Sequence, residues 1–376
     1  MTRVYRYLFA ALLLALLLPA SGALAQQTIT SAPIPSAFRL DGFRYEPQGW
    51  NNCGPATLTN ALTFFGYTDN QQRAARWLKP NNEDKNVNPS EMVAFVNTQV
   101  PELPVYALTR YNGTLDLLKT LIANRYPVII EAGYDPEPQR LGWMGHYLLM
   151  IGYDDGRREF ITHDSYDGAN LPYSYDHIET FWRHFNRTYI VLYESGREPE
   201  LLALLGADAD AHQNALNALE QARQEAAANP KRDPYAWFNM GTSYLALAPV
   251  YGQQAYEYAA AAFDVALKMD ASTPEQRQLD PDVAMPWRTL WYQFGPYEAY
   301  NATGQYQKTL QWAGNVLNDG GGHWVEETFY YAGAAREGLG ETSKALENYR
   351  QAAFLNSNFQ AARDARDRLQ ATASGG

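Results

Sequence analysis

The pattern of apolar and polar positions divides the chain into two regions of different character. In the first region, apolar positions recur at helical spacing and later at the shorter spacing of strands. Helices are predicted at residues 53–65, 71–78, 89–96 and 114–124. Strands are predicted at residues 127–130, 145–153, 159–164 and 189–193, and a further helix near residues 173–185. Helices followed by an antiparallel sheet predict an α+β domain over residues 41–197.

A hairpin between two of these strands places two polar residues together. Asp154-Asp155-Gly156 has the composition of a tight turn and separates the strands at 145–153 and 159–164. His146 opens the first strand and Asp164 ends the second, so we expect them to be near neighbours. His163 should point to the opposite face, because successive side chains alternate along a strand.

From residue 198 to about residue 372 the chain is rich in alanine, glutamine and leucine and keeps a helical period. Self-similarity at about 34 residues predicts tetratricopeptide repeats. The last copy carries small and aromatic residues at Phe329, Gly333, Gly340, Ala345, Tyr349 and Ala352. An earlier copy carries Trp237, Met240, Gly241, Tyr244, Ala259, Phe263 and Ala266, with an insertion near residues 249–252. A degenerate middle copy carries Tyr297, Tyr300, Gly304, Ala313 and Val316.

The predicted repeat domain holds more aromatic residues than a small repeat core needs. Packing between stacked helices accounts for most of them. The remainder can line a groove for an extended peptide, so a protein partner can bind this domain. The candidates are Trp287, Trp291, Tyr292, Tyr297, Tyr300, Trp312 and Trp324.

The first 25 residues have the pattern of a secretory signal peptide. Arg3 and Arg6 precede the apolar run Leu8–Leu18, and the small residues at 23–25 predict cleavage after Ala25. The alternative is an uncleaved membrane anchor, but the run is shorter than the roughly 20 residues that span a bilayer. We therefore expect a secreted or extracytoplasmic bacterial protein with no membrane span after cleavage. Residues 26–40 are expected to form a leader segment.

Composition and charge exclude several classes of function. The net charge is −11, so a basic face for nucleic acid is not expected. Hydrophobic residues make up 46% of the chain, enough for a core in each domain. The sequence has no His/Cys/Asp/Glu cluster at metal-ligand spacing and no glycine pattern for a nucleotide. We expect no metal and no cofactor.

Cys53 is the single cysteine of the chain. A lone cysteine can be a small buried hydrophobe, but an exported protein that keeps one unpaired thiol risks its oxidation. Cys53 opens a predicted helix, whose N-terminal partial charge favours the nucleophilic thiolate. A histidine oriented by a carboxylate, here His146 and Asp164, is the usual activator of such a nucleophile. Gln48 and the Cys53 backbone N–H can stabilise an oxyanion.

The order Gln48, Cys53-Gly54-Pro55, Gly145-His146, His163-Asp164 resembles the papain-like cysteine peptidases of the bacterial double-glycine-leader (bacteriocin-processing) family, in its stand-alone, family-thirty-nine-like branch. The resemblance covers roughly residues 40–195. It implies a papain-like fold in which Cys53, His146 and Asp164 are the triad and Gln48 supplies the oxyanion hole. Transporter-fused members usually carry aspartate where this chain has Asn52. Because papain-like enzymes can use asparagine as the orienting residue, Asn170 is the alternative to Asp164.

The sequence thus predicts an exported cysteine peptidase that hydrolyses peptide bonds in a peptide or protein substrate. One alternative is a catalytically inactive peptidase-fold scaffold that binds proteins through its repeats. Another is acyl transfer to an amine by the same triad. The composition break near residues 196–200 predicts that the first domain folds alone. The rival expectation is that the repeat helices close over the cleft.

Overall fold

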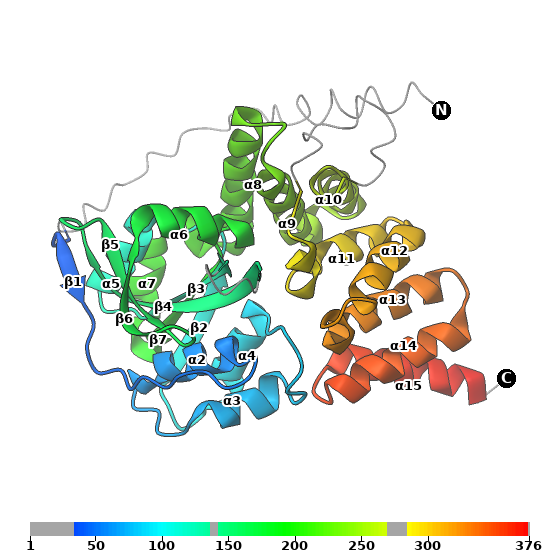
Figure 1. The fold of residues 1–376 in the computed structure, drawn as a ribbon, viewed down its shortest axis with the longest axis horizontal. Helices are drawn as coiled ribbons and strands as arrows, with labels where there is room; N and C mark the ends of the chain where they lie inside the picture. Colours follow the sequence, from blue (N-terminus) through cyan, green and yellow to red (C-terminus); the bar gives the residue numbers. More distant parts are fainter. Residues whose placement is uncertain (1–33, 136–141, 269–283, 375–376) are drawn as a thin grey trace. The chain divides into compact units, whose positions relative to one another are not determined.

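The computed structural model describes residues 34–135, 142–268 and 284–374 (Figure 1). The expected signal peptide, and the expected leader up to residue 33, lie outside these residues. None of the described helices is both long enough and apolar enough to cross a membrane. From Pro35 onward the chain forms one compact unit.

Helices that open the first region begin where local hydrogen bonds cap them. The side chains of Asn70 and Thr114 accept N–H groups at the starts of their helices. Glu91 accepts the Asn88 N–H at 2.8 Å, and Pro89 takes the first helical position, where its missing N–H costs nothing. The four helices are α2 (Cys53–Thr63), α3 (Gln71–Leu78), α4 (Pro89–Gln99) and α5 (Leu115–Ala123).

An antiparallel sheet follows, as the sequence predicts. Its strands are β1 (Ala37–Arg39), β2 (Val105–Arg110), β3 (Val128–Tyr134), β4 (Met144–Asp154), β5 (Glu159–Asp164), β6 (Gly168–Ser174) and β7 (Tyr189–Glu194). The order within the described residues is β2-β7-β3-β4-β5-β6, and β1 pairs with the far end of β4. Gly152 permits that last pairing, because a Cβ there would lie 2.9 Å from the Phe38 carbonyl oxygen.

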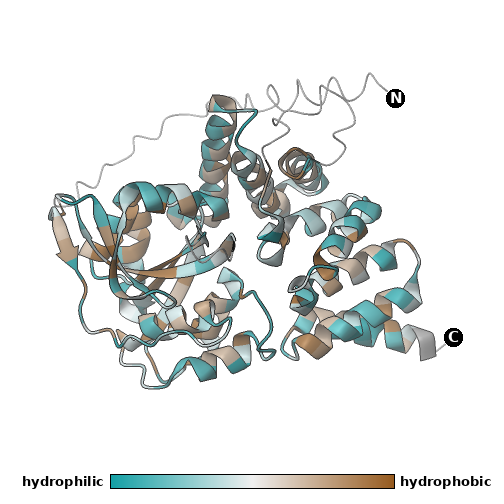
Figure 2. Ribbon diagram, viewed as in Figure 1, coloured by the Kyte–Doolittle hydropathy of each residue, from teal (hydrophilic) through white to brown (hydrophobic). Residues whose placement is uncertain are grey.

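The sheet separates two sets of helices. Helices α2, α3 and α4 cover one face with a core centred on Leu58, Phe95, Leu149 and Ile190. Helices α5, α6 (Tyr175–Trp182) and α7 (Glu198–Leu205) cover the other face. The middle strands are the most hydrophobic part of this region, as Figure 2 shows. Helix α2 is buried on every side from Gly54 to Thr63, so its N-terminus is held firmly in the region that carries the predicted site.

The second region is helical, as predicted. Its helices are α8 (Ala211–Ala228), α9 (Pro234–Tyr251), α10 (Gln253–Ala266), α11 (Gly295–Ala302), α12 (Tyr306–Leu317), α13 (Glu326–Gly338), α14 (Thr342–Leu355) and α15 (Gln360–Ser374). Each packs on the next along the chain. Small residues admit aromatic rings between partners: a Cβ on Gly241 would lie 2.5 Å from Phe263, and one on Gly333 would lie 2.8 Å from Tyr349. The assignment as tetratricopeptide repeats stays a prediction.

Three parts of the structure differ from the expected elements. Strands β2 and β6 were not predicted, and residues 37–39 of the expected leader pair with β4 as β1. The expected insertion near residues 249–252 falls at the end of α9, which continues through Pro249 to Tyr251.

Polar side chains join the two regions. Asn86 and Asn88 donate from Nδ2 to Glu327 Oε1 at 3.1 and 2.8 Å. Asn356 Nδ2 donates to the Leu78 carbonyl oxygen at 3.4 Å. Elsewhere Asn186 Nδ2 donates to Ser243 Oγ at 3.1 Å. Three of these contacts lie at the end of α3 and in the segment between α3 and α4.

Candidate active site

Cys53 is the first residue of α2 and is half-buried, whereas the ten residues that follow it in the helix are buried. The N–H groups of a first helical turn have no acceptor within the helix. Asn52 does not cap them, since its Nδ2 donates to Gln71 Oε1 at 3.1 Å and its Oδ1 accepts from Lys79 Nζ at 3.4 Å. The thiol therefore lies at the positive end of a buried helix.

His146 and Asp164 form a buried pair at the start of β4 and the end of β5. Their Nε2 and Oδ1 atoms are 2.8 Å apart. Asp164 lies opposite Leu148 in the strand register, two positions from His146, so both side chains leave the same face of the sheet. His146 is 6% exposed and Asp164 is 0% exposed. The structure thus brings together the two residues that the hairpin predicted to be neighbours.

The Asp164 carboxylate has further donors. Its Oδ1 also accepts the N–H groups of Tyr166 and Asp167 at 2.8 and 3.1 Å. Its Oδ2 accepts the Tyr173 hydroxyl at 2.8 Å. Burial alone would raise the pKa of Asp164, but the charge of His146 and these hydrogen bonds lower it to about 2. The carboxylate therefore stays ionised although it is buried.

His146 is correspondingly held as an imidazolium. Burial lowers its pKa, whereas the charge and hydrogen bond of Asp164 and a hydrogen bond with Cys53 raise it to about 10. The ring of Tyr134 lies over it, with centroids 5.1 Å apart. The Tyr134 hydroxyl is fixed by Asp167 Oδ2 at 2.9 Å. A cationic imidazole, anchored on one nitrogen by a carboxylate, therefore contacts the thiol.

Gln48 is oriented by the residue that follows Asp164. Ser165 Oγ donates to Gln48 Oε1 at 3.0 Å, and the Gln48 N–H donates to the Ser165 carbonyl oxygen at 2.7 Å. Thr57 of α2 lies behind, with its Oγ1 3.3 Å from Ser165 Oγ. Because Ser165 fixes the amide oxygen, the amide NH₂ of Gln48 points away from Ser165. Residues 164 and 165 thus orient both the imidazole and the glutamine.

Gln71 fixes the segment before the cysteine and was not predicted as a site residue. Its Oε1 accepts from the Gly49 N–H at 2.7 Å as well as from Asn52. Its Nε2 donates to Glu46 Oε1 at 2.7 Å and to the Pro47 carbonyl oxygen at 2.8 Å. The sequence around Gln71 does not indicate this role, because the partners of its side chain lie more than 18 positions upstream.

The alternative orienting residue, Asn170, does not face His146. Its Oδ1 accepts from Arg39 Nη2 at 2.7 Å. Its N–H donates to Nδ1 of His163 at 3.2 Å, on the opposite face of β5 from Asp164. Burial and then the charge of Arg39 lower the pKa of His163 to about 4. These contacts favour Asp164 over Asn170.

Two further histidines lie in an aromatic cluster. His184 stacks on Tyr235 with centroids 3.8 Å apart and accepts the Trp143 Nε1–H at 3.0 Å. Burial and the charge of Arg183 lower the pKa of His184 to about 3. His177 stacks on Tyr173 at 4.8 Å. Within the described residues, no group of three or more His, Cys, Asp or Glu side chains is placed to hold a metal ion.

The aromatic residues expected to line a peptide groove have different surroundings. Tyr297 and Tyr300 are fully buried in the helical core, and Trp291 is buried as well. Trp287 is 59% exposed and lines, with Trp312, a cavity of about 140 Å³. The groove therefore stays a prediction for these two tryptophans.

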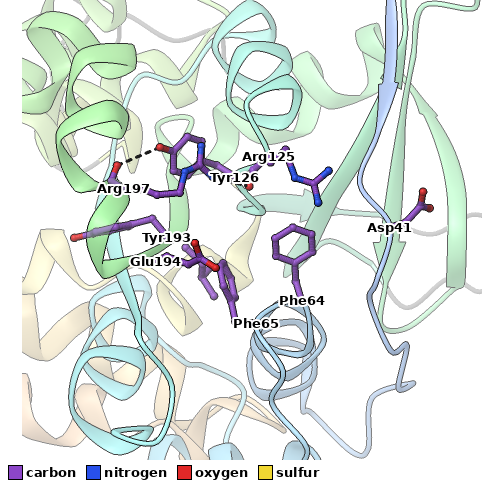
Figure 3. Close-up of a pocket in the computed structure, with 9 residues that line it drawn as sticks. Asp41, Phe64, Phe65, Arg125, Tyr126, Tyr193, Glu194 and Arg197 are labelled. Carbon is purple, nitrogen blue, oxygen red and sulfur yellow. Dashed lines mark hydrogen bonds between the residues drawn. The ribbon is translucent and has the colours of Figure 1, made fainter.

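A separate cavity of about 260 Å³ lies at the other end of α2 (Figure 3). Phe64 and Phe65, which directly follow the helix, line it with Arg125, Tyr126 and Arg197. The Tyr126 hydroxyl donates to the Arg197 carbonyl oxygen at 3.2 Å. Since a helix rises about 1.5 Å per residue, the cavity lies roughly 16 Å from the thiol and is no part of the candidate site.

Comparison with known proteins gives one family match. Residues 39–191 match the model described as the Peptidase_C39 like family, a range that includes Gln48, Cys53, His146 and Asp164. A crystal structure described as that of a C39-like peptidase from Bacillus anthracis is similar over 42% of this chain and 98% of that chain, with 14% identity and a TM-score of 0.34. No curated protein matches the sequence. The family match supports a C39-like peptidase domain in residues 39–191.

Proposed function

We propose that the chain is a cysteine peptidase in which Cys53, His146 and Asp164 hydrolyse peptide bonds. The observation that carries the proposal is the buried His146–Asp164 pair, which presents a charged imidazole to a thiol at a helix N-terminus. An inactive scaffold would have no need to keep a buried ion pair against this thiol, because buried charges cost free energy unless they are well paired.

In the first half of the reaction, the Cys53 thiolate attacks the scissile carbonyl carbon. The carbonyl oxygen becomes an oxyanion, which accepts hydrogen bonds from the Cys53 N–H and the Gln48 amide. His146 donates its Nδ1 proton to the departing amine as the C–N bond breaks. The products are a free amine and a thioester on Cys53. Asp164 keeps Nε2 occupied, so the other ring nitrogen stays directed at the thiol.

In the second half, neutral His146 takes a proton from water as the water oxygen attacks the thioester. The C–S bond then breaks, Cys53 leaves as thiolate, and the carboxylic acid is released. His146 keeps the proton and returns to its imidazolium form. The cycle needs no oxidant, reductant or metal, because each proton removed in one step returns in the other.

The test uses a mixed fluorogenic peptide library with the full chain and its Cys53→Ser variant. We expect hydrolysis by the wild type and a loss of at least about a thousandfold in the variant, since serine lacks a stable anion here. A thiol-directed peptide probe should label the wild type alone. Added glycinamide distinguishes the alternatives: amide products would indicate acyl transfer. Equal hydrolysis by both proteins, or none by either, would contradict the proposal.

We also propose export and a binding role for the helical region. Export is supported by the charged, apolar and small-residue pattern of residues 1–25. Protein binding by the helices is supported by the exposed Trp287 beside a cavity. N-terminal sequencing of the protein from a bacterial host would test the export, with Gln26 as the expected first residue.

A further inference from the structure

Tyr292 of the helical region lies against the strand that carries His146. It follows the short turn Trp287–Trp291 (η4), which packs on β4. A Cβ on Gly145 would lie 2.8 Å from Tyr292 Cδ1 and 2.9 Å from Phe185 Cζ. The Tyr292 ring also meets Trp143 edge-on, with centroids 5.9 Å apart. Glycine at position 145 is therefore required by a side chain from the other region.

The Tyr292 hydroxyl lies within the electrostatic reach of the nucleophile. Burial raises the pKa of this hydroxyl, and negative charge on Cys53 raises it further. Arg288 and a backbone hydrogen bond from Gly145 act in the opposite direction. The hydroxyl therefore keeps its proton at neutral pH, so the side chain that packs on Gly145 is uncharged.

Neighbouring contacts fix Tyr292 in this position. Gln293 Nε2 donates to the His184 carbonyl oxygen at 3.1 Å, which ties the next residue to the first region. The Tyr292 N–H donates to the Thr289 carbonyl oxygen at 3.1 Å within the turn. Thr289 Oγ1 in turn donates to the Pro286 carbonyl oxygen at 2.7 Å. The ring therefore belongs by sequence to the helical region and by contact to the candidate active site.

We propose that Tyr292 is a positioning residue of the active site. Its ring fixes the backbone of Gly145 and thereby the start of the strand that holds His146 toward Cys53. This inference rests on the proposed peptidase function. It makes the helical region part of the active site and not only a surface for partners, because a chain that ends at residue 197 lacks Tyr292.

The experiment compares the full chain with its Tyr292→Leu variant, which removes the ring from Gly145, and with Tyr292→Phe, which keeps the ring and removes only the hydroxyl. Iodoacetamide alkylation of Cys53 is followed from pH 5 to 10, and kcat and KM are measured on a hydrolysed library peptide. We expect Tyr292→Leu to alkylate about tenfold more slowly at pH 7 and to lower kcat about tenfold with KM within twofold, because a displaced imidazole no longer faces the thiol. Tyr292→Phe should restore both quantities to wild-type values, because it keeps the ring. Tyr297→Phe, which alters a fully buried tyrosine of the same region, is the matched control and should match the wild type.

The outcomes separate this inference from the proposed function. Fast alkylation in the wild type with the same rate and the same kcat in Tyr292→Leu would overturn the role of Tyr292 and leave the peptidase proposal intact. Slow alkylation of the wild type at every pH would overturn both. Equal losses in Tyr292→Leu and Tyr292→Phe would show that the ring does not position His146 and would also overturn this inference.

Discussion

Two buried acidic sites in this molecule hold their protons in opposite ways. At the first, Asp164 is fully buried and yet ionised, with its pKa lowered to about 2. At the second, Asp84, Glu326 and Glu327 are buried where the helices meet the first region, and burial raises the pKa of each. The pKa of Asp84 rises to about 6. Burial is common to both sites, so burial alone does not decide the charge.

The difference lies in the partners. Asp164 has a cationic imidazole, two backbone N–H groups and a hydroxyl on its two oxygens. Glu327 Oε1 has only the neutral amides of Asn86 and Asn88, and Glu326 Oε1 has Asn356 at 2.7 Å. Within the described residues, the Oε2 atoms of both glutamates have no hydrogen-bond partner. A buried carboxylate stays ionised down to low pH where a charged donor and several others converge, and otherwise it keeps its proton up to a higher pH than usual.

Lys79 is a buried basic side chain at the second site and is the counterpart there of His146 at the first. Burial lowers its pKa, and the charges of Asp84, Cys53 and Glu326 raise it only in part. Its Nζ contacts neutral oxygens instead, Asn52 Oδ1 at 3.4 Å and the Asn82 carbonyl at 3.3 Å. Because Asn52 precedes Cys53, the second site is connected to the nucleophile through one side chain.

Removing His146 or Asp164 should have the largest effect on activity of the changes considered. We expect His146→Ala and Asp164→Ala each to lower kcat by roughly 10³- to 10⁴-fold, and the double variant to be little worse, since the two act as one unit. Peptide hydrolysis measured at pH 7 tests this. Asp164→Ala within a few-fold of the wild type would show that the backbone and other groups orient His146 without the carboxylate.

The pH dependence of the free energy of unfolding, compared between the wild type and Asp164→Ala, tests the charges assigned to His146 and Asp164. The raised pKa of His146 means that the folded state binds more protons than the unfolded state between pH 6.5 and about 10. The pair's stabilisation is thus complete below pH 6.5 and is lost as pH rises through about 10. The lowered pKa of Asp164 means that it is also lost as pH falls from about 4 through about 2. Denaturant unfolding of wild type and Asp164→Ala should therefore differ most between about pH 4 and 6.5.

The central strands and the position of the pair were predictable from the sequence because they follow local rules. The turn Asp154-Asp155-Gly156 fixes which residues of β4 and β5 lie opposite each other. The sequence missed three strands: β2 and β6 end the main strand order on its two sides, and β1 pairs with the far end of β4. Strand β6 alternates between exposed and half-buried positions and includes Pro172, so no apolar pattern marks it.

The partners of the site were less predictable. Tyr173 reaches Asp164 only because β6 folds back on β5, and that strand carries no signal of its own. Ser165 and Gln71 act through an ordinary hydroxyl and an ordinary amide, so their residue types do not distinguish them from surface residues. Tyr292 lies far along the chain, and the sequence placed it among the aromatic residues expected to line a peptide groove. Contacts between distant segments depend on packing, which a single sequence does not encode locally.

A substitution at the second site tests whether its carboxyl groups are protonated in the folded state, because their titration makes the free energy of unfolding depend on pH. Its carboxyl groups have raised pKa values, that of Asp84 being about 6, so the folded state binds more protons than the unfolded one above about pH 4, and stability falls as pH rises from there. Glu327→Gln keeps an oxygen for Asn86 and Asn88 and cannot ionise. We expect its unfolding midpoint in denaturant to match the wild type near pH 5 and to exceed it at pH 8.

The matched control for that change lies on the same helix. Glu337 of α13 is bound by Arg368, whose hydrogen bond lowers the pKa of this glutamate. Glu337→Gln should therefore cause a small loss of stability at pH 8 and no gain. A gain of the same size in both variants would show that net charge, and not burial at the junction, sets the slope.

The smallest effect is expected from Tyr173→Phe, which removes one of the donors to Asp164. The carboxylate keeps His146 and two N–H groups, so the pKa of Asp164 should rise but remain below its ordinary value of 3.8. We expect kcat/KM at pH 7 to fall a few-fold and the acidic limb of its pH profile to move upward. Tyr175→Phe is the matched control, because the Tyr175 hydroxyl makes the same 2.8 Å bond to Asp155, away from the site. If both variants keep the wild-type profile, the imidazolium and the backbone suffice to hold Asp164 ionised. A shift confined to Tyr173→Phe would instead show that the lowered pKa depends on the full set of donors, because the charge of His146 is the same in both proteins.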